Sequence, residues 1–293
     1  MLTNKHLGLI TFSLIFLASC GGGSDTGISS PGELSQIAAP TATTTTVAVG
    51  GSVLTGSCPS GTNVSTDSAI AGNTVCAISG VVKDDLALTN DVIWRLLGKV
   101  EIGADVGGDG SKAGGDPAVL TIPAGVTVVA KTTDDYIVVQ RGSKMEALGT
   151  ASKPIVFTHS SVLDGTISNA ATARGLWGGV VILGRAPINK CSNALRGTAG
   201  CEKEVEGSTD AIMGGALPED NSGTLRFVRV EHAGYEIFPG NELNGITFGA
   251  VGSGTTVDYV QVHNNEDDCV EFFGGTVNVK HLVCTNAGDD NLD

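Results

Sequence analysis

The sequence is poor in aromatic residues, basic residues and long apolar runs. Aromatic residues make up 4% of the 293 residues, and 17 Lys and Arg stand against 31 Asp and Glu. Because this excess of carboxylates repels phosphate groups, the balance excludes a nucleic-acid-binding protein. The chain also lacks any run of about eighteen apolar residues, the minimum for a membrane-spanning helix, and this excludes a transporter built from such helices.

Several short motifs that carry chemistry are also missing. The sequence has no CxxC pair, which argues against a zinc ribbon and a thioredoxin-type redox site. It has no GxSxG nucleophile turn and no phosphate-binding loop ending in GK[ST]. The common hydrolase and nucleotide-binding classes therefore have no support.

Glycine and β-branched residues are abundant. The chain contains 42 glycines, about twice the usual share, and 41% of its residues are hydrophobic. Glycine, threonine and valine disfavour a coiled coil, and this apolar content disfavours a wholly disordered chain. The composition predicts an all-β protein made of many short strands.

The N-terminus has the pattern of an export signal. Lys5 precedes an apolar run from Leu7 to Leu17, and Leu17-Ala18-Ser19-Cys20 resembles a bacterial lipobox. This resemblance implies a signal peptide over residues 1–19 and a lipid on Cys20, followed by a flexible tether over residues 20–50. By the usual sorting rule Gly21 implies an outer-membrane location, with the domain facing the periplasm or the cell surface.

The remaining cysteines are even in number, as expected in an oxidising compartment. Their spacing predicts the disulfides Cys58–Cys76 and Cys191–Cys201, each of which closes a short polar segment. The first would staple an N-terminal cap over residues 51–80. For Cys269 and Cys284, a disulfide and two buried free thiols are both open.

An internal repeat is the main evidence for the fold. Residues 257–271 align with residues 279–293 at an offset of 22, and residues 225–234 form an earlier copy at an offset of 32. Apolar residues alternate within each copy, as in a strand with one buried face. A period near 22 with Asn and Asp in the turns indicates stacked coils rather than an antiparallel sandwich, with Val260 next to Leu282 and Val270 next to Leu292. The same register would stack Asn264 on Asn286 as an amide ladder.

Four blocks, residues 120–128, 142–158, 175–184 and 220–230, resemble a family of bacterial outer-membrane lipoproteins. The resemblance implies a right-handed, single-stranded parallel β-helix of pectate-lyase-like (pectin lyase-like) architecture, here over residues 81–293. The family is largely uncharacterised, so the resemblance implies a fold and a location rather than a reaction. Its members look longer than this chain, and we expect the chain to be truncated at its C-terminus.

Candidate chemistry is confined to the acidic turns of the repeat. The 22-residue register places Asp267 on Asp289 and Asp268 on Asp290, and it also aligns Glu271 with Asp293. These side chains could point apart into water, bind Ca²⁺, or serve as a general acid and base of the kind that glycoside hydrolysis uses. Asp267-Asp268-Cys269 also resembles the Asp-Asp-Cys block of polygalacturonases, but no Asn-Thr-Asp block precedes it.

Two other features have weaker functional readings. Residues 105–116 contain three Asp among glycines without EF-hand spacing, which predicts a flexible loop rather than a calcium site. Trp94 and Trp177 are expected at a core edge and a coil corner rather than as a sugar-stacking pair.

Two functions of different classes follow. The favoured one is a non-catalytic lipoprotein that is held to the membrane by its lipid and presents a β-helix face to a polysaccharide or another envelope component. The alternative is a Ca²⁺-dependent polysaccharide lyase or glycoside hydrolase that acts on acidic polysaccharide at Asp267, Asp268, Asp289 and Asp290.

Overall fold

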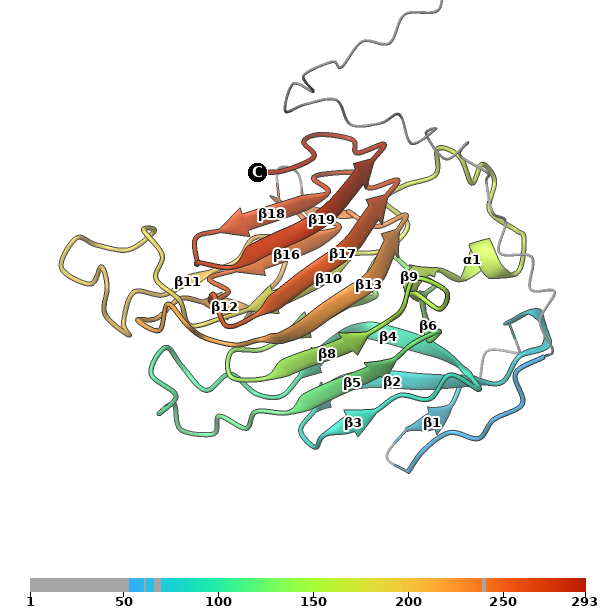
Figure 1. The fold of residues 1–293 in the computed structure, drawn as a ribbon, viewed down its shortest axis with the longest axis horizontal. Helices are drawn as coiled ribbons and strands as arrows, with labels where there is room; N and C mark the ends of the chain where they lie inside the picture. Colours follow the sequence, from blue (N-terminus) through green and yellow to red (C-terminus); the bar gives the residue numbers. More distant parts are fainter. Residues whose placement is uncertain (1–52, 61, 66–69, 239–240) are drawn as a thin grey trace, which may run out of the picture. The chain divides into compact units, whose positions relative to one another are not determined.

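The computed structural model describes residues 53–60, 62–65, 70–238 and 241–293. The signal peptide, Cys20 and the tether lie outside the described residues. In the described part of the chain, no helix is both long and apolar enough to cross a membrane. Strands dominate this part and pair mostly in parallel, with each coil of the chain hydrogen-bonded to the next (Figure 1).

The strands form three parallel faces, which we name A, B and C. Face A contains the first half of β2 (Val75–Val82) and of β4 (Ile93–Ile102), then β6 (Thr127–Ala130), β9 (Ile155–His159), and the second halves of β13 (Gly223–Glu231), β17 (Thr256–His263) and β19 (Asn278–Thr285). Face B contains the second halves of β2 and β4, then β7 (Tyr136–Val139), β10 (Val180–Leu183), β16 (Ile246–Gly249) and β18 (Val270–Phe273). Face C contains β3 (Leu86–Ala87), β5 (Val119–Pro123), β8 (Lys144–Leu148) and the first halves of β13, β17 and β19.

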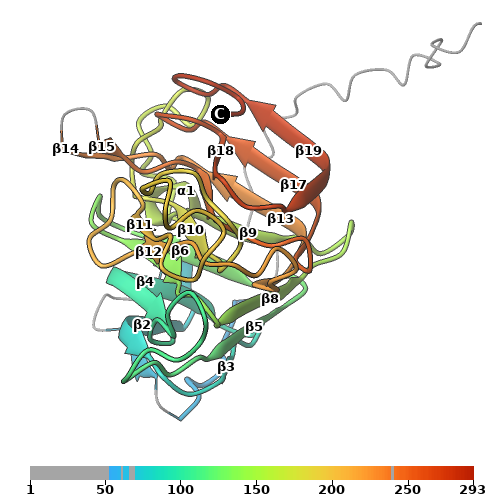
Figure 2. The ribbon, with the colours of Figure 1, turned by 90° about the vertical axis from the view of Figure 1, so that its left-hand side faces the viewer.

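The remaining elements are short. They are β1 (Asn63–Val64), η1 (Ile70–Gly72), α1 (Ser160–Leu163), β11 (Lys203–Glu204), β12 (Ile212–Met213), β14 (Glu236–Phe238) and β15 (Asn241–Glu242). β1 pairs antiparallel with β2, and the hairpins β11–β12 and β14–β15 lie outside the main sheet. The coils follow one another from β2 and β3 at one end to β18 and β19 at the other (Figure 2).

The expected parallel β-helix is therefore present, and its last step has the expected register. Val260 pairs with Leu282 across β17 and β19, and Val270 forms a parallel bridge with Leu292. Most earlier steps are longer than 22 residues, as between Thr127 and Val156, because loops leave the stack at its corners. The stack also begins earlier than expected: β2, which starts at Val75, already pairs with β4, so the stack begins inside the segment assigned to the cap.

Corner residues form columns along the stack. His232, Asn264 and Asn286 all have positive φ at the corner that ends face A. The Asn286 Nδ2 donates to Asn264 Oδ1 at 2.6 Å, which is the amide ladder that the repeat predicts. A second column consists of Phe227, Tyr259 and His281, whose rings stack with centroids 4.6 and 4.2 Å apart.

Inward-facing apolar residues of the three faces form one core along the stack. Trp94 and Trp177 belong to this core and are buried, as expected of structural rather than sugar-binding residues. A second apolar cluster lies outside face B and includes Tyr136, Val181 and Met213. It fills the space between face B and a long excursion of the chain, residues 186–219, which we call the lobe.

Candidate functional site

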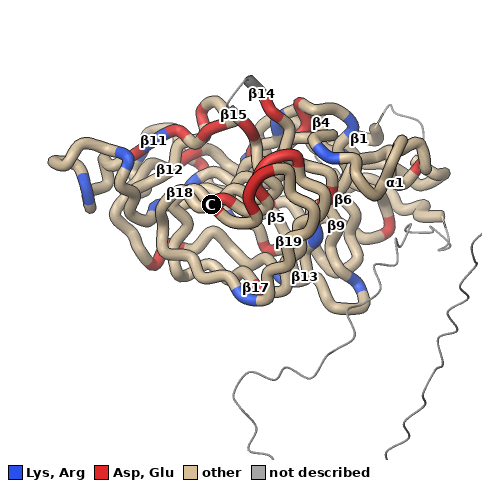
Figure 3. Tube along the Cα trace, turned by 90° about the horizontal axis from the view of Figure 1, so that it is seen from above, with Lys and Arg blue, Asp and Glu red and all other residues tan. Residues whose placement is uncertain are grey.

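The acidic turns meet at the C-terminal end of the described stack. The backbone N–H of Cys269 donates to Asp290 O at 3.0 Å, so the two turns lie one above the other. Two groups of carboxylates have oxygens within 4.8 Å of one another: Asp267, Asp268 and Asp289, and Asp268, Glu271 and Asp293. We call these five residues the acidic cluster; Figure 3 shows acidic residues gathered beside the last residue of the chain.

Of the four residues predicted as a site, the structure brings three side chains together. The exception is Asp290, which instead donates its backbone N–H to Asp268 Oδ1 at 2.8 Å. Glu271 and Asp293, which the repeat aligned without assigning them to the site, complete the acidic cluster.

Burial and mutual repulsion raise the pKa of several of these carboxyls. Burial, and then the neighbouring Asp268, raises the pKa of Asp267 to about 6. Burial, and then Glu206, raises the pKa of Glu271 to about 8. Burial also raises the pKa of Asp268. Burial and neighbouring carboxylates therefore favour the protonated form of Glu271 near neutral pH.

Two buried amides support the acidic cluster. The Asn244 Nδ2 donates to Glu271 Oε2 at 2.5 Å, and the Asn265 Nδ2 donates to Asp268 O at 2.6 Å. Asn244 Oδ1 has no hydrogen-bond partner and is buried. The carboxylates and this amide oxygen are of the ligand type that Ca²⁺ prefers, so they are the residues that could hold such an ion.

Glu206 and Glu242 extend the acidic cluster from other parts of the chain. Glu206 comes from the lobe and hydrogen-bonds Glu271, and burial followed by Glu242 raises the pKa of Glu206. Sequence reasoning missed both residues. Each lies in an insertion that does not repeat, so no periodic signal connects it with Glu271.

A groove runs beside the acidic cluster between face B and the lobe. It consists of two cavities of about 640 and 500 Å³ that share Lys190, Met213 and Phe273. Tyr136 and Glu206 line the larger cavity, and Glu271 and Asp293 line the smaller one. Apolar rings, charged groups and hydroxyls thus face the same open space, as in sites that bind polar organic ligands.

The comparisons agree with this architecture. The family model described as pectate-lyase like beta helix domain matches residues 80–293. The chain belongs to this pectate-lyase-like β-helix family. No curated protein and no solved structure matches the chain.

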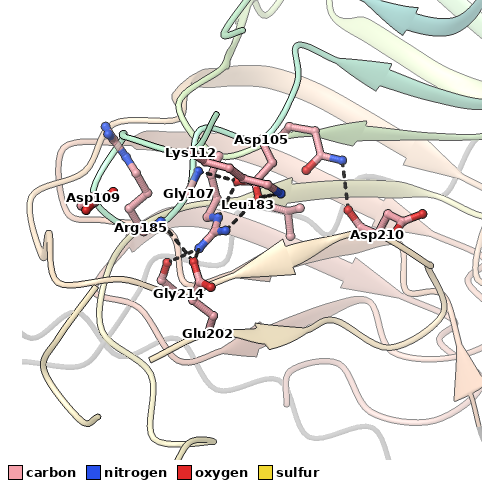
Figure 4. A network of polar contacts seen from close by, with 12 residues as sticks. Asp105, Gly107, Asp109, Lys112, Leu183, Arg185, Glu202, Asp210 and Gly214 are labelled. Atoms are coloured by element: carbon pink, nitrogen blue, oxygen red, sulfur yellow. Dashed lines mark hydrogen bonds and ion pairs between the residues drawn. The ribbon is translucent and has the colours of Figure 1, made fainter. Parts of the chain in front are cut away.

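In this pectate-lyase-like domain the lobe is held by a buried arginine, Arg141, whose partners Asp105, Glu202 and Gly214 are labelled in Figure 4. Arg141 is 1% exposed and donates from Nε and Nη2 to the two oxygens of Asp105 at 2.7 and 2.8 Å. Its Nη1 donates to Glu202 Oε1 at 2.6 Å and to Gly214 O at 2.7 Å, both in the lobe. Arg141 therefore joins the loop after β4 to the lobe.

The expectation of a flexible loop over residues 105–116 needs correction at its first residue. Asp105 is buried and also accepts from Lys112 Nζ at 2.8 Å. Burial raises the pKa of Asp105, but hydrogen bonds from Arg141 and Lys112 outweigh it and lower this pKa to about 2. The sequence could not show this, because Asp105 and Arg141 come from separate coils.

Further contacts fix the two ends of the lobe and the part of it that lies against face B. Arg185 and Asp220 directly precede and follow the lobe in the sequence. Arg185 donates from Nε and Nη2 to Asp220 Oδ1 at 3.0 and 2.6 Å, which joins the two ends of the lobe. Where the lobe meets face B, the Lys99 Nζ donates to Thr209 O at 2.6 Å, and the Tyr136 hydroxyl lies 3.2 Å from Ser208 Oγ.

The cysteines follow the expected pattern in part. Disulfides join Cys58 to Cys76 and Cys191 to Cys201, and the second lies inside the lobe. Cys269 and Cys284 are free thiols, so the third pairing is not formed in this structure. Cys269 is buried in the apolar core of the stack, and the half-buried Cys284 packs against this core. Unpaired cysteine in such a place behaves as a small apolar residue.

Proposed function

We propose that this protein is a cell-envelope lipoprotein whose β-helix binds a glycan in the groove over face B. The observation that carries the proposal is the groove itself, which is bounded by the lobe and ends at the acidic cluster. Glycans present hydroxyl groups and apolar ring faces, and the groove offers both charged hydrogen-bonding groups and the rings of Tyr136 and Phe273.

A binding measurement tests the groove. The full chain carrying Cys20→Ala, which cannot be lipidated, is titrated with neutral, acidic and amine-bearing polysaccharides by calorimetry, with and without Ca²⁺. We expect one class to bind, and Lys190→Ala to change its affinity, because Lys190 lines both cavities. The variant should weaken binding of a neutral or acidic polysaccharide, which loses a hydrogen-bond donor, and strengthen binding of an amine-bearing one, which loses a like charge. Lys153→Ala is the matched control, since Lys153 is an exposed lysine that lines neither cavity. Equal affinities of the two variants would contradict the proposed site.

The proposed anchor is a lipid on Cys20, and it rests on the lipobox-like sequence before that residue. In a Gram-negative host, labelled palmitate should enter the wild-type chain and the chain should fractionate with the outer membrane. Cys20→Ala should abolish both. A wild-type chain that takes up no label and remains in the soluble fraction would refute the anchor.

The close approach of the carboxylate oxygens in the acidic cluster, within 4.8 Å of one another, supports a second candidate, a Ca²⁺-dependent enzyme acting on acidic polysaccharide. Paired carboxyl groups are also what glycoside hydrolysis uses as general acid and general base. The full chain is incubated with acidic polysaccharides, with Ca²⁺ and with chelator. Reducing or unsaturated ends that disappear in Asp268→Ala would establish the enzyme, and no release from any of them would leave binding alone.

A further inference from the structure

A third cavity lies beside the lobe, and no residue of the acidic cluster lines it. It has a volume of about 560 Å³ and lies between residues 105–116 and the lobe. Asp109, Ser111 and Lys112 line it from one side, and Gly200 and Glu202 line it from the lobe. None of these residues belongs to the groove described above.

This third cavity adjoins the groove. Lys203 and Glu204, which form β11, line both the third cavity and the 640 Å³ cavity. The latter in turn shares residues with the 500 Å³ cavity beside Glu271. The three cavities therefore follow one another past β11.

The register of face B gives the length of this path. Arg141, in the wall of the third cavity, follows β7, whereas Glu271 lies in β18. β10 and β16 lie between these two strands. Three strand spacings correspond to about 14 Å along the stack, which is longer than a single sugar ring.

The walls of the third cavity are fixed before any ligand arrives. Arg141 binds Asp105 on one wall and Glu202 on the other, and Gly108 donates its backbone N–H to Glu202 Oε1 at 3.1 Å. Because these contacts are charged and partly or fully buried, they hold the two loops in one arrangement. A ligand that enters does not have to order the loops, which lowers the cost of binding.

The charges along the path differ from one end to the other. The end near β18 carries the acidic cluster together with Glu206. The third cavity presents both signs of charge, with carboxylates from Asp109, Glu202 and Glu204 beside Lys112 and Lys203. The acidic end favours an ammonium group, and the mixed end offers donors and acceptors for hydroxyl groups.

We propose that the third cavity is a distal subsite of the groove and that the ligand is a linear, amine-bearing polysaccharide reaching from the acidic cluster to Asp109. This inference rests on the proposed function, because it needs the groove to bind a glycan. Beyond the proposed function, it specifies how long the glycan is and which charge it carries.

Glucosamine oligomers of increasing length test it. The full chain with Cys20→Ala is titrated by calorimetry with the dimer and with successively longer oligomers, and with the N-acetylated series. Affinity should rise by roughly tenfold or more from the dimer to the longest glucosamine oligomer, as additional subsites fill. The N-acetylated series, which lacks the charge, should bind more weakly.

Two variants locate the distal subsite. Asp109→Asn removes an exposed carboxylate from the third cavity and leaves the contacts of Asp105 with Arg141 and Lys112 in place. Gly200→Trp fills the cavity, and the added Cβ would meet only Leu195 and Thr198 at 3.7 and 3.8 Å, which is ordinary contact. Both variants should weaken the binding of the longest oligomer by roughly fivefold to tenfold and leave that of the dimer unchanged. Glu219→Gln, which alters an exposed carboxylate outside the three cavities, should change neither.

The outcomes separate the two proposals. If the dimer binds as tightly as the longest oligomer, or if neither variant affects the longest one, the distal subsite is refuted and the groove remains. If the N-acetylated series binds more tightly, the assigned charge of the ligand is refuted. If no oligomer of either series binds to a chain that melts normally, the proposed glycan function fails and the inference fails with it.

Discussion

At the scale of single residues, buried charges and their partners decide how this protein responds to pH. Asp105 and Arg141 form a bidentate pair in which both side chains are buried. A buried pair of this kind is costly to break, because removing one partner leaves the other charge without compensation. Neither residue stood out in the sequence, since an ion pair between separate coils leaves no local pattern.

Asp105→Asn tests this pair. The pKa of Asp105 is about 2 in the fold against 3.8 as an ordinary carboxyl, so the folded state favours the ionised form. Ionised Asp105 contributes about 2 kcal/mol to the free energy of unfolding. This contribution is complete above about pH 4 and is lost as the pH falls towards 2. We expect the variant to lose about 3 kcal/mol in urea unfolding at pH 7 and to lack this part of the acid dependence.

Asp109→Asn is the control, because Asp109 is exposed in the same loop and contacts only Ser111 through its side chain. It should leave stability at pH 7 nearly unchanged. Equal stability losses for the two variants would show that the Asp105–Arg141 pair does not hold the lobe.

Glu271 has the opposite pH dependence. Burial and Glu206 raise its pKa from 4.5 to about 8, so the folded state favours the protonated form. Its stabilising contribution is full below about pH 4.5 and is lost as the pH rises through 8. Glu271→Gln, which stays neutral, should therefore melt at a higher temperature than the wild type at pH 9 and lose less stability between pH 5 and pH 9.

Calorimetric melting at these two pH values measures the effect, with the exposed Glu219→Gln as a control. If Glu271→Gln shows the same pH dependence as the wild type, then Glu271 is ionised in the folded protein at neutral pH. In that case the acidic cluster would lack a protonated carboxyl at this position.

At the scale of elements, the repeat predicted the strands and corners of the last two coils well. Val257, Val260 and Val262 face the core beside Val279, Leu282 and Cys284, because a step of 22 residues returns each position to its own place in the next coil. The lobe could not be predicted in this way. It occurs once, and its position depends on contacts with Arg141, Lys99 and Tyr136 that are distant in sequence.

The asparagine column allows a test of corner stacking. Asn264 is buried, donates to Ala170 O at 2.8 Å and accepts from Asn286 at 2.6 Å, whereas Asn286 is exposed. Both residues have positive φ, so both alanine variants carry that backbone cost, and only Asn264→Ala also loses buried hydrogen bonds. We expect Asn264→Ala to cost about 2–3 kcal/mol and Asn286→Ala to cost about 1 kcal/mol less than that. Urea unfolding measures both, and equal costs would contradict the role assigned to this corner.

At the scale of the whole described domain, the stack and the lobe together create the candidate site. Face B alone would present flat strands to solvent, and the lobe alone has a small apolar cluster that needs face B to cover it. The sequence predicted the stack and the meeting of Asp267, Asp268 and Asp289. It did not predict the groove, because the groove exists only where a non-repeating insertion folds back on repeating strands.

Hydrogen–deuterium exchange with a bound glucosamine oligomer tests the central claim most directly, because it locates the ligand on the stack. In the full chain with Cys20→Ala, we predict slower exchange in residues 105–116, in the lobe between residues 187 and 213, and in residues 270–275. Exchange in β5, β8 and the first half of β13 on face C should remain unchanged. A footprint on face C, or no footprint at saturating oligomer, would contradict a glycan groove over face B.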